Sequence, residues 1–295
     1  MPLYLAATPD RLTRARAVTP RLAHVAYRLG PGSELLAAPL PPALRGGLMV
    51  LSDWDCPPVE EPDRLAHVAY RLGPGSELLA APLPPALRGG LMVLSDWDCP
   101  PVEEPDRLAR QIARACLRRG YAGMAADFDP PARPGRLALL EALSPLLASC
   151  GRTLYVPEHC PIAGATILLC TALSGGTLEG RLTQAVDQYG AEHLALDLQR
   201  LAMDFPLPCP GGQGTPLTLP QLEALAAGRP TFYSDALCAR YFTLTRQGQT
   251  HFVLFDDART LRRKLELARQ LGIRDALVML PEVEDLLEPL FAGES

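Results

Sequence analysis

The chain has no apolar run that approaches the roughly 20 residues of a membrane-spanning helix, although 48% of its 295 residues are hydrophobic. Its first residues, MPLYLAATPDRLTRARAV, contain no uninterrupted apolar core of signal-peptide length. The 28 Lys and Arg residues are scattered and are outnumbered by 33 Asp and Glu residues. A basic surface for nucleic acid or for an anionic membrane is therefore not expected. These absences predict a cytoplasmic protein that binds neither nucleic acid nor membrane.

Metal-binding patterns are also absent. The eight cysteines form no CxxC pair and no Cys/His spacing typical of a zinc site. Several lie in apolar stretches, such as Cys116 in QIARACLRRG and Cys170 in ATILLCTA. In a cytoplasmic protein we expect them to be reduced thiols that pack as small apolar residues. The glycine-rich CPGGQG at 209–214 does not follow the strand-to-helix pattern of a phosphate loop. We expect no metal and no other cofactor.

Strands and helices alternate from residue 106 onward, as judged from apolar periodicity and Gly/Pro boundaries. The predicted helices are 106–120, 135–151, 178–190, 218–228 and 258–272. The predicted strands are 121–129, 152–158, 192–199 and 274–280, and residues 165–176 predict a strand followed by a Gly-rich turn. Residues 240–256 break the alternation and predict an antiparallel hairpin around RQGQ. The alternation predicts right-handed βαβ units and a parallel sheet, hence the α/β class.

The N-terminal part contains an internal repeat, because residues 21–63 and 64–106 are identical over all 43 positions. Each copy predicts two strands, HVAYRL and GGLMVLSD, without a helix between them. Perfect identity indicates a recent duplication or an assembly artefact, since drift would have blurred an old repeat.

Two arrangements of the repeat have nearly equal energies. In the first, 64–106 supplies both sheet strands and 21–63 is displaced. In the second, the first strand comes from the first copy and the second strand from the second copy, with 43 residues bulging between them. We expect the first arrangement, because the second copy runs directly into the helix 106–120.

The C-terminal segment YFTLTRQGQTHFVLFDDARTLRRKLELARQLGIRDALVML resembles the end of family-18 glycoside hydrolases, in the branch of spore-cortex-lytic and chitinase-like proteins of spore-forming bacteria. LALDLQRLAMDFPLP is similar to the seventh strand of that branch and the stretch after it. YAGMAADFDPP is similar to the family motif Asp-Gly-x-Asp-x-Asp-x-Glu. The resemblance covers roughly residues 64–287.

The resemblance implies a (β/α)8-type TIM barrel, complete or reduced, with a small antiparallel hairpin insertion. The stretch between Glu158 and Ala165 is too short for the family's fifth strand and helix, which favours a reduced or irregular barrel. The implied domains are an N-terminal segment 1–63 that includes the surplus copy 21–63, a barrel 64–288 with the hairpin at about 231–256, and a tail 289–295.

The family's chemistry is substrate-assisted cleavage of N-acetylglucosaminides at the C-terminal ends of the strands. When the sequence is aligned with the motif, Asp127 corresponds to its third Asp and Asp129 stands in place of its Glu. The resemblance therefore implies that Asp129 is the general acid and Asp127 its partner. Ala122 and Ala125 replace the other two acids. The strand LLCTA lacks the family's Tyr and carboxylate, and Met279 stands where the family has a sugar-binding Trp. These departures predict an eroded catalytic site.

Four further residues are candidate substrate contacts. Trp97 and the neighbouring Asp96 follow an apolar strand, where the ring could stack on a sugar or, equally, cover the barrel rim. Glu158 ends a strand as a second carboxylate. Asp204 matches a family Asp, although an Asp in a loop commonly forms a turn.

Two functions remain open at this point. The first is a barrel of eroded catalysis that binds an N-acetylglucosamine-type glycan or serves a structural role. The second is an active glycosidase with Asp129 as general acid. The missing Tyr, Glu and Trp favour the first. A glycan is the expected ligand in either case, and the oligomeric state is not predicted.

Overall fold

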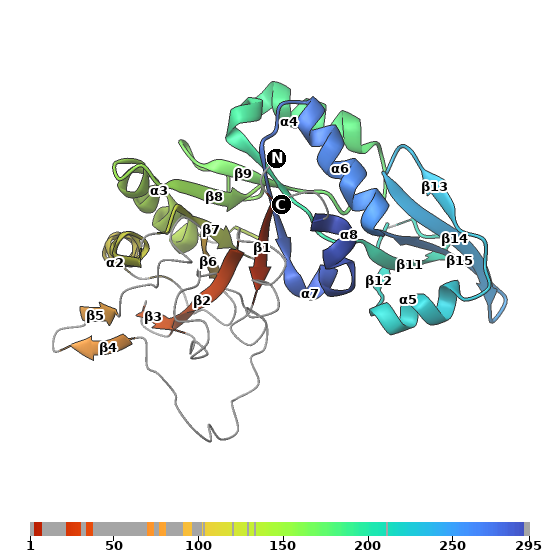
Figure 1. The fold of residues 1–295 in the computed structure, drawn as a ribbon, viewed down its shortest axis with the longest axis horizontal. Helices are drawn as coiled ribbons and strands as arrows, with labels where there is room; N and C mark the ends of the chain where they lie inside the picture. The colour runs from red at the N-terminus through yellow and green to blue at the C-terminus, as the bar shows by residue number, and fades with distance from the viewer. Residues whose placement is uncertain are drawn as a thin grey trace, which may run out of the picture. The chain divides into compact units, whose positions relative to one another are not determined.

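The computed structural model describes most of the chain from residue 102 onward and short segments before it: residues 3–7, 22–30, 34–37, 70–73, 77–80, 91–95, 102, 104–119, 121–128, 130–132, 134–210 and 212–291. The chain forms two compact units (Figure 1). The first unit contains residues 2–168 and 277–281, and the second contains residues 169–276 and 282–295. Within the described ranges, no helix has the length and apolarity to cross a membrane.

The first unit is built on a curled parallel sheet. Its central strands are β1 Leu3–Ala7, β2 Leu22–Gly30, β6 Leu91–Ser95, β7 Gly123–Asp127, β8 Thr153–Pro157 and β9 Thr166–Cys170. Each strand pairs in parallel with the next one in this order. The middle of β7 and of β8 is buried, as expected of strands covered on both faces. The predicted α/β class is confirmed in this parallel, curled half-barrel, and a complete (β/α)8 barrel stays a prediction.

Two helices of the first unit pack against each other, α2 Pro105–Arg119 and α3 Pro134–Ala148. On α2 the buried residues Leu108, Ile112 and Cys116 recur every fourth position, which aligns them on one face. Burial raises the pKa of the Cys116 thiol to about 12, so this cysteine is an apolar core residue, as predicted. Of the cysteines that the structure describes, none forms a disulfide.

The connection between β8 and β9 is unusual for a parallel pair. Residues 158–165 form turns and contain no helix, whereas parallel neighbours are ordinarily joined by a crossover of a dozen or more residues. The sequence predicted that this stretch is too short for a further strand and helix, and it contains no helix. An irregular barrel stays a prediction.

The two repeat copies fold alike locally and pair differently. In the first copy β2 pairs in antiparallel with β3 Glu34–Ala37, and in the second copy β4 Tyr70–Gly73 pairs in the same register with β5 Glu77–Ala80. Of the two hairpins that the structure describes, the first copy's joins the parallel sheet, where β2 lies beside β6 of the second copy. The structure therefore differs from the expected arrangement: the sheet takes one strand from each copy.

Deletion of 43 residues, one repeat length, is expected to leave the melting temperature unchanged or to raise it. Because the copies are identical, removing either one yields the same chain, and that chain retains both β2 and β6. Each halving of a loop gains about 0.6 kcal/mol, so the shorter connection between these strands gains on the order of 1 kcal/mol. Thermal unfolding followed by circular dichroism tests this. An unfolded deletion variant would show that the extra copy is needed.

The second unit contains an antiparallel sheet of five strands (Figure 1). In spatial order they are β12 Thr215–Pro216, β11 Ala202–Leu207, β15 Gln249–Phe255, β14 Ala239–Arg246 and β13 Phe232–Ser234. The strands around RQGQ, β14 and β15, pair in antiparallel as the alternation predicts. The sequence did not predict β11, which extends this pair on the other edge of β15.

Both faces of the antiparallel sheet are covered. One face carries a core of Leu222, Phe242 and Val253, in which Leu222 comes from α5 Leu219–Ala226. The other face carries Leu201, Phe205, Ala239 and Leu254. Helix α5 starts at the capping box of Thr218 and Gln221, within the predicted helix 218–228.

The remaining elements of the second unit continue the alternation of helices and strands. They are α4 Leu178–Tyr189, β10 Leu194–Asp197, α6 Ala258–Gln270 and α8 Leu287–Phe291, while β16 Asp275–Met279 and the short α7 Leu280–Val283 run from one unit into the other. Helix α6 starts at a second capping box, Asp257 with Thr260. Asp197 at the end of β10 and the residues after β16 belong to the site described next.

Candidate functional site

The C-terminal edge of the parallel sheet in the first unit gathers several predicted site residues. Asp127 is the last residue of β7, and the strand register places it next to Ser95, the last residue of β6. Glu158 follows directly on β8, the next strand along. Asp127 and Glu158 therefore lie at neighbouring strand ends, the edge at which barrel folds place their sites. The other predicted residues of this edge, Asp96, Trp97 and Asp129, lie outside the described residues.

The motif strand β7 presents its carboxylate to solvent. Ala125 is 1% exposed where the family motif has an acid, and Asp127 is exposed. The next residue, Phe128, is buried, with the guanidinium carbon of buried Arg136 at 6.0 Å from the ring centroid. Asp127 is thus not enclosed in the way that the motif position predicts for an interior acid.

Asp204 and Met279 lie in separate units. Asp204 is buried in β11, so its expected position in a loop is wrong. Its Oδ1 lies 2.9 Å from Nδ1 of His251, and its Oδ2 accepts a hydrogen bond from Arg246 at 3.4 Å. The carboxylate therefore joins β11 to both β15 and β14 of the antiparallel sheet. Met279 ends β16 and is half-buried.

A second pair of carboxyls, which the sequence did not single out, lies in the second unit. Asp197 ends β10, and Glu282 follows three residues after the end of β16. Oε2 of Glu282 accepts a hydrogen bond from the backbone N–H of Arg200 at 2.9 Å. The guanidinium of Arg200 donates to the carbonyl of Glu282 at 3.0 Å and makes a two-pronged contact with Asp285 at 2.5 and 3.1 Å. These contacts fix the segment after β16 to the segment after β10.

Both carboxyls of this pair hold their protons more tightly than usual. Burial raises the pKa of Asp197 to about 6. Burial also raises the pKa of Glu282 to about 7; the negative charge of Asp197 adds to the rise, and the Arg200 backbone hydrogen bond opposes it. A pKa near neutrality is what a general acid or base requires at physiological pH. Perturbed carboxyls are concentrated at functional sites, which makes Asp197 and Glu282 candidates for proton transfer.

A buried ion pair supports this region. Nζ of Lys264 is 2.7 Å from Oδ2 of Asp256 and donates to the carbonyl of Thr171 at 3.0 Å. Oδ2 of Asp256 also accepts from the backbone N–H of Leu201 at 2.9 Å, and its Oδ1 accepts from the hydroxyl of Thr260 at 2.8 Å. The pair joins α6 to the segments that follow β9 and β10.

A thiol completes the surroundings of Asp197. Cys170 ends β9 and donates from Sγ to Oε1 of Gln199 at 3.2 Å. Burial, and then the charge of Asp197, raise the pKa of this thiol, which keeps it protonated. Cys170 is thus a hydrogen-bond donor here and not a nucleophile, because the thiolate is the reactive form.

A simple sequence signal would have found Asp197 and Glu282. Asp197 is an acid near the end of the predicted strand 192–199, and Glu282 comes two residues after the predicted strand 274–280. Acids at the C-terminal ends of parallel strands are candidate site residues in any barrel. Among the described residues, no group of three or more His, Cys, Asp or Glu side chains is arranged to hold a metal ion.

Comparison with solved structures finds glycoside hydrolases. A chitinase from Chromobacterium violaceum is similar with a TM-score of 0.62 at 14% identity, over 99% of this chain and 99% of that one. The spore cortex-lytic enzyme SleL of Bacillus megaterium has a TM-score of 0.58 at 15% identity, over 98% of this chain and 73% of that one. A GH18 chitinase from Cycas revoluta in complex with (GlcNAc)3 has a TM-score of 0.57 at 10% identity, over 99% of both chains.

Sequence comparisons add nothing to this similarity. No protein-family model matches the chain, and comparison with curated proteins gives no match. At the low identities of the structural neighbours, the similarity shows the fold alone. The chain has a fold like that of family-18 glycoside hydrolases, which confirms the resemblance read from the sequence at the level of the fold.

Proposed function

We propose that this protein is a family-18-like barrel that binds an N-acetylglucosamine-type glycan and has lost most of the family's catalytic activity. The observation that carries the proposal is the composition of the motif strand, where a buried alanine, Ala125, occupies an acid position and Asp127 is exposed. Asp127 and Glu158 remain at adjacent strand ends, where carboxylates can accept hydrogen bonds from sugar hydroxyls.

The fold supports a glycan as the ligand class. The structural neighbours include chitinases, and one of them was solved with (GlcNAc)3 bound. Sites in barrel folds lie at the C-terminal strand ends, where Asp127 and Glu158 lie here. Binding at this edge does not require the motif acids, whereas cleavage does.

A second function, an active glycosidase, is favoured by the raised pKa values of Asp197 and Glu282. At pH 7 a carboxyl with a pKa of about 7 is half protonated, so Glu282 can donate a proton. The family motif would instead assign this role to Asp129. Because the two candidate general acids, Glu282 and Asp129, are different residues, substituting each one separately tests the enzyme hypothesis.

The binding proposal predicts that an N-acetylglucosamine trimer binds at millimolar concentrations, where a Kd of 1 mM corresponds to about −4 kcal/mol. Glu158→Gln is expected to weaken this binding by about tenfold, because a hydrogen bond to a charged group contributes about 1.5–3 kcal/mol. Isothermal titration calorimetry measures both. Glu141→Gln is the matched control, since Glu141 is exposed on α3 away from the strand ends.

Hydrolysis of a chromogenic N-acetylglucosamine oligomer separates the two functions. We expect no hydrolysis above the uncatalysed rate alongside measurable binding. Activity that is lost in Asp129→Asn would instead establish a family-18 enzyme, and activity lost only in Glu282→Gln would move the acid to the second unit. Absence of both binding and hydrolysis would overturn the glycan proposal.

A further inference from the structure

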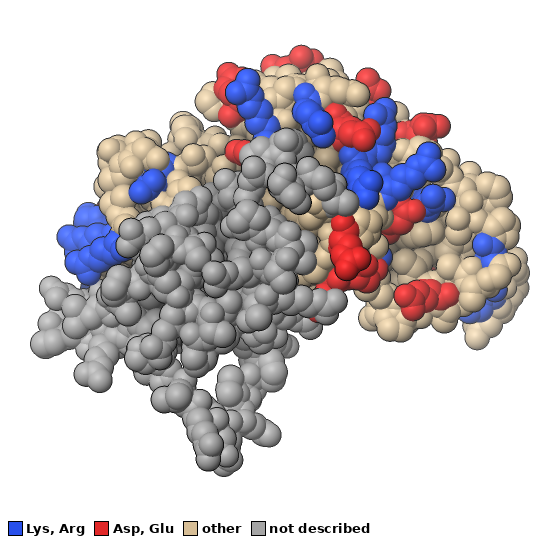
Figure 2. Space-filling model, in the orientation of Figure 1, with Lys and Arg blue, Asp and Glu red and all other residues tan. Residues whose placement is uncertain are grey.

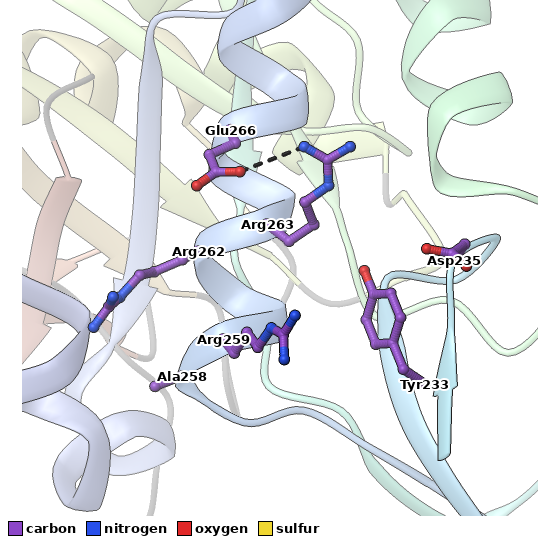
Figure 3. Close-up of a pocket in the computed structure, with 7 residues that line it drawn as sticks. All are labelled: Tyr233, Asp235, Ala258, Arg259, Arg262, Arg263 and Glu266. Atoms are coloured by element: carbon purple, nitrogen blue, oxygen red, sulfur yellow. Dashed lines mark hydrogen bonds and ion pairs between the residues drawn. The ribbon is translucent and has the colours of Figure 1, made fainter.

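The second unit has a pocket of about 540 Å³ that the proposed glycan site does not use (Figure 3). It lies between the first turns of α6 and the β13 strand with the turn that follows it. Its lining consists of charged residues and one aromatic ring: Tyr233, Asp235, Ala258, Arg259, Arg262, Arg263 and Glu266. Basic side chains also gather over α6 in the surface view (Figure 2).

The three arginines of the pocket differ in their partners. Arg263 pairs with Glu266 on the same helix, at 3.4 Å. Arg262 donates to the carbonyl of Pro289 and extends away from Tyr233 (Figure 3). Arg259 has no hydrogen bond or ion pair to any residue that the structure describes. Its guanidinium therefore brings an uncompensated positive charge to the pocket.

The position of Arg259 leaves its guanidinium as the group that favours an anion. Arg259 belongs to the first turn of α6, and the N-terminal end of this helix is already capped by the Asp257 carboxylate. A guanidinium presents parallel N–H donors that match the two oxygens of a carboxylate or a phosphate. The guanidinium therefore favours a ligand that carries one of these groups.

The opposite wall adds an aromatic surface and a carboxylate. Tyr233 is 39% exposed, and its side chain lies across from Arg259 in Figure 3. Burial of the phenol and its hydrogen bond to Cys238 raise the pKa of Tyr233 to about 12, so the hydroxyl stays neutral. Its ring can pack on the apolar face of a ligand ring. Asp235 beside it accepts hydrogen bonds from hydroxyls and repels an anion placed near it.

These features describe one class of ligand, with an oxyanion at the Arg259 end and hydroxyls at the Asp235 end. We propose that this pocket binds a small molecule that carries a carboxylate or a phosphate on a hydroxylated ring, such as an acidic sugar. The site is separate from the strand ends of the first unit, so it stands or falls independently of the glycan proposal.

Titration with three probes tests the proposal: glucuronate, glucose 6-phosphate and uncharged glucose. We expect at least one of the two acids to bind at concentrations up to about 10 mM, and glucose to bind at least about tenfold more weakly, since charge-assisted hydrogen bonds are roughly twice as strong as neutral ones. The acid that binds more tightly identifies the oxyanion. Raising the salt concentration should weaken binding, because the pocket is open to solvent.

Variants show where the probe binds. Arg259→Met should weaken binding of the acid by at least about tenfold, while Arg269→Met, an exposed arginine in the last turn of the same helix, should not change it. Tyr233→Phe keeps the ring and tests the hydroxyl. Unchanged thermal unfolding of Arg259→Met is expected, because the side chain is exposed. Glucose binding as tightly as the acids, no binding of either acid, or undiminished binding to Arg259→Met would each overturn the proposal.

Discussion

Replacement of Lys264 by methionine lowers the free energy of unfolding by about 3–5 kcal/mol, the expected loss when one partner of a buried ion pair is removed. Lys264 is fully buried, and Asp256 is 1% exposed. The substitution leaves the Asp256 carboxylate with its two uncharged donors, the N–H of Leu201 and the hydroxyl of Thr260, but without a cation. It also removes the donor to the carbonyl of Thr171. Urea unfolding at pH 7, followed by circular dichroism, measures the change.

Three further variants separate charge from shape. Arg263→Met, on the exposed face of α6, should change stability by less than about 0.5 kcal/mol. Lys264→Arg keeps the charge but should not restore stability, because a buried guanidinium needs partners for five N–H donors. The double variant Asp256→Leu, Lys264→Met should be more stable than Lys264→Met, since no uncompensated charge remains buried. A single Lys264→Met variant as stable as the parent would contradict the assigned role of the pair.

This ion pair also explains a feature of the composition. Lys264 is the only lysine among the 28 basic residues of the chain. An ammonium is compact and has three donors, so it fits a dry site between a carboxylate and a carbonyl, where an arginine does not. An exchange of lysine for arginine is conservative at an exposed position, but it is not conservative at the buried position 264.

The parallel part of the fold was predictable because its signals are local. Apolar runs of strand length and helical periodicity specify elements from residues close together in the sequence. The pairing of β2 with β6 was not predictable from such signals, since two identical copies offer the same strand twice. Which of the two copies supplies a given sheet strand depends on which strand reaches the sheet. That outcome depends on how the whole chain folds, and a local sequence signal does not encode it.

The candidate site was predictable only in part, for a related reason. Strand ends could be read from the sequence, so Asp127 and Glu158 were placed at neighbouring ends as the register shows. Burial of individual carboxyls could not be read in the same way. Asp127 is exposed, although its position in the motif predicts an interior acid. Asp204 lies in β11, whose mixture of apolar and polar residues did not predict a strand. Burial raises the pKa of Glu282, and Asp197, whose negative charge adds to the rise, lies about 85 positions earlier in the sequence.

Stability that falls as the pH rises from about 4 to about 7 is the second large expected effect. In the unfolded chain Asp197 and Glu282 titrate near their ordinary values of 3.8 and 4.5, whereas in the folded chain their pKa values are about 6 and about 7. Within this window the folded state binds more protons than the unfolded state, so each unit of pH increase favours unfolding. One pKa unit corresponds to about 1.4 kcal/mol. Because both carboxyls are partly exposed, solvent screening reduces the total to on the order of 2 kcal/mol for the pair.

Neutral variants of the two carboxyls test this origin of the pH dependence. Glu282→Gln keeps an acceptor for the Arg200 N–H and cannot ionise, so it should resemble the parent protein near pH 4 and exceed its stability at pH 8. Asp197→Asn should act in the same direction over a window that ends about one pH unit lower. Glu288→Gln, exposed on α8, should leave the pH profile unchanged. If Glu282→Gln left the slope between pH 5 and 7 intact, the raised pKa would belong to another group, and the case for proton transfer by Glu282 would fail with it.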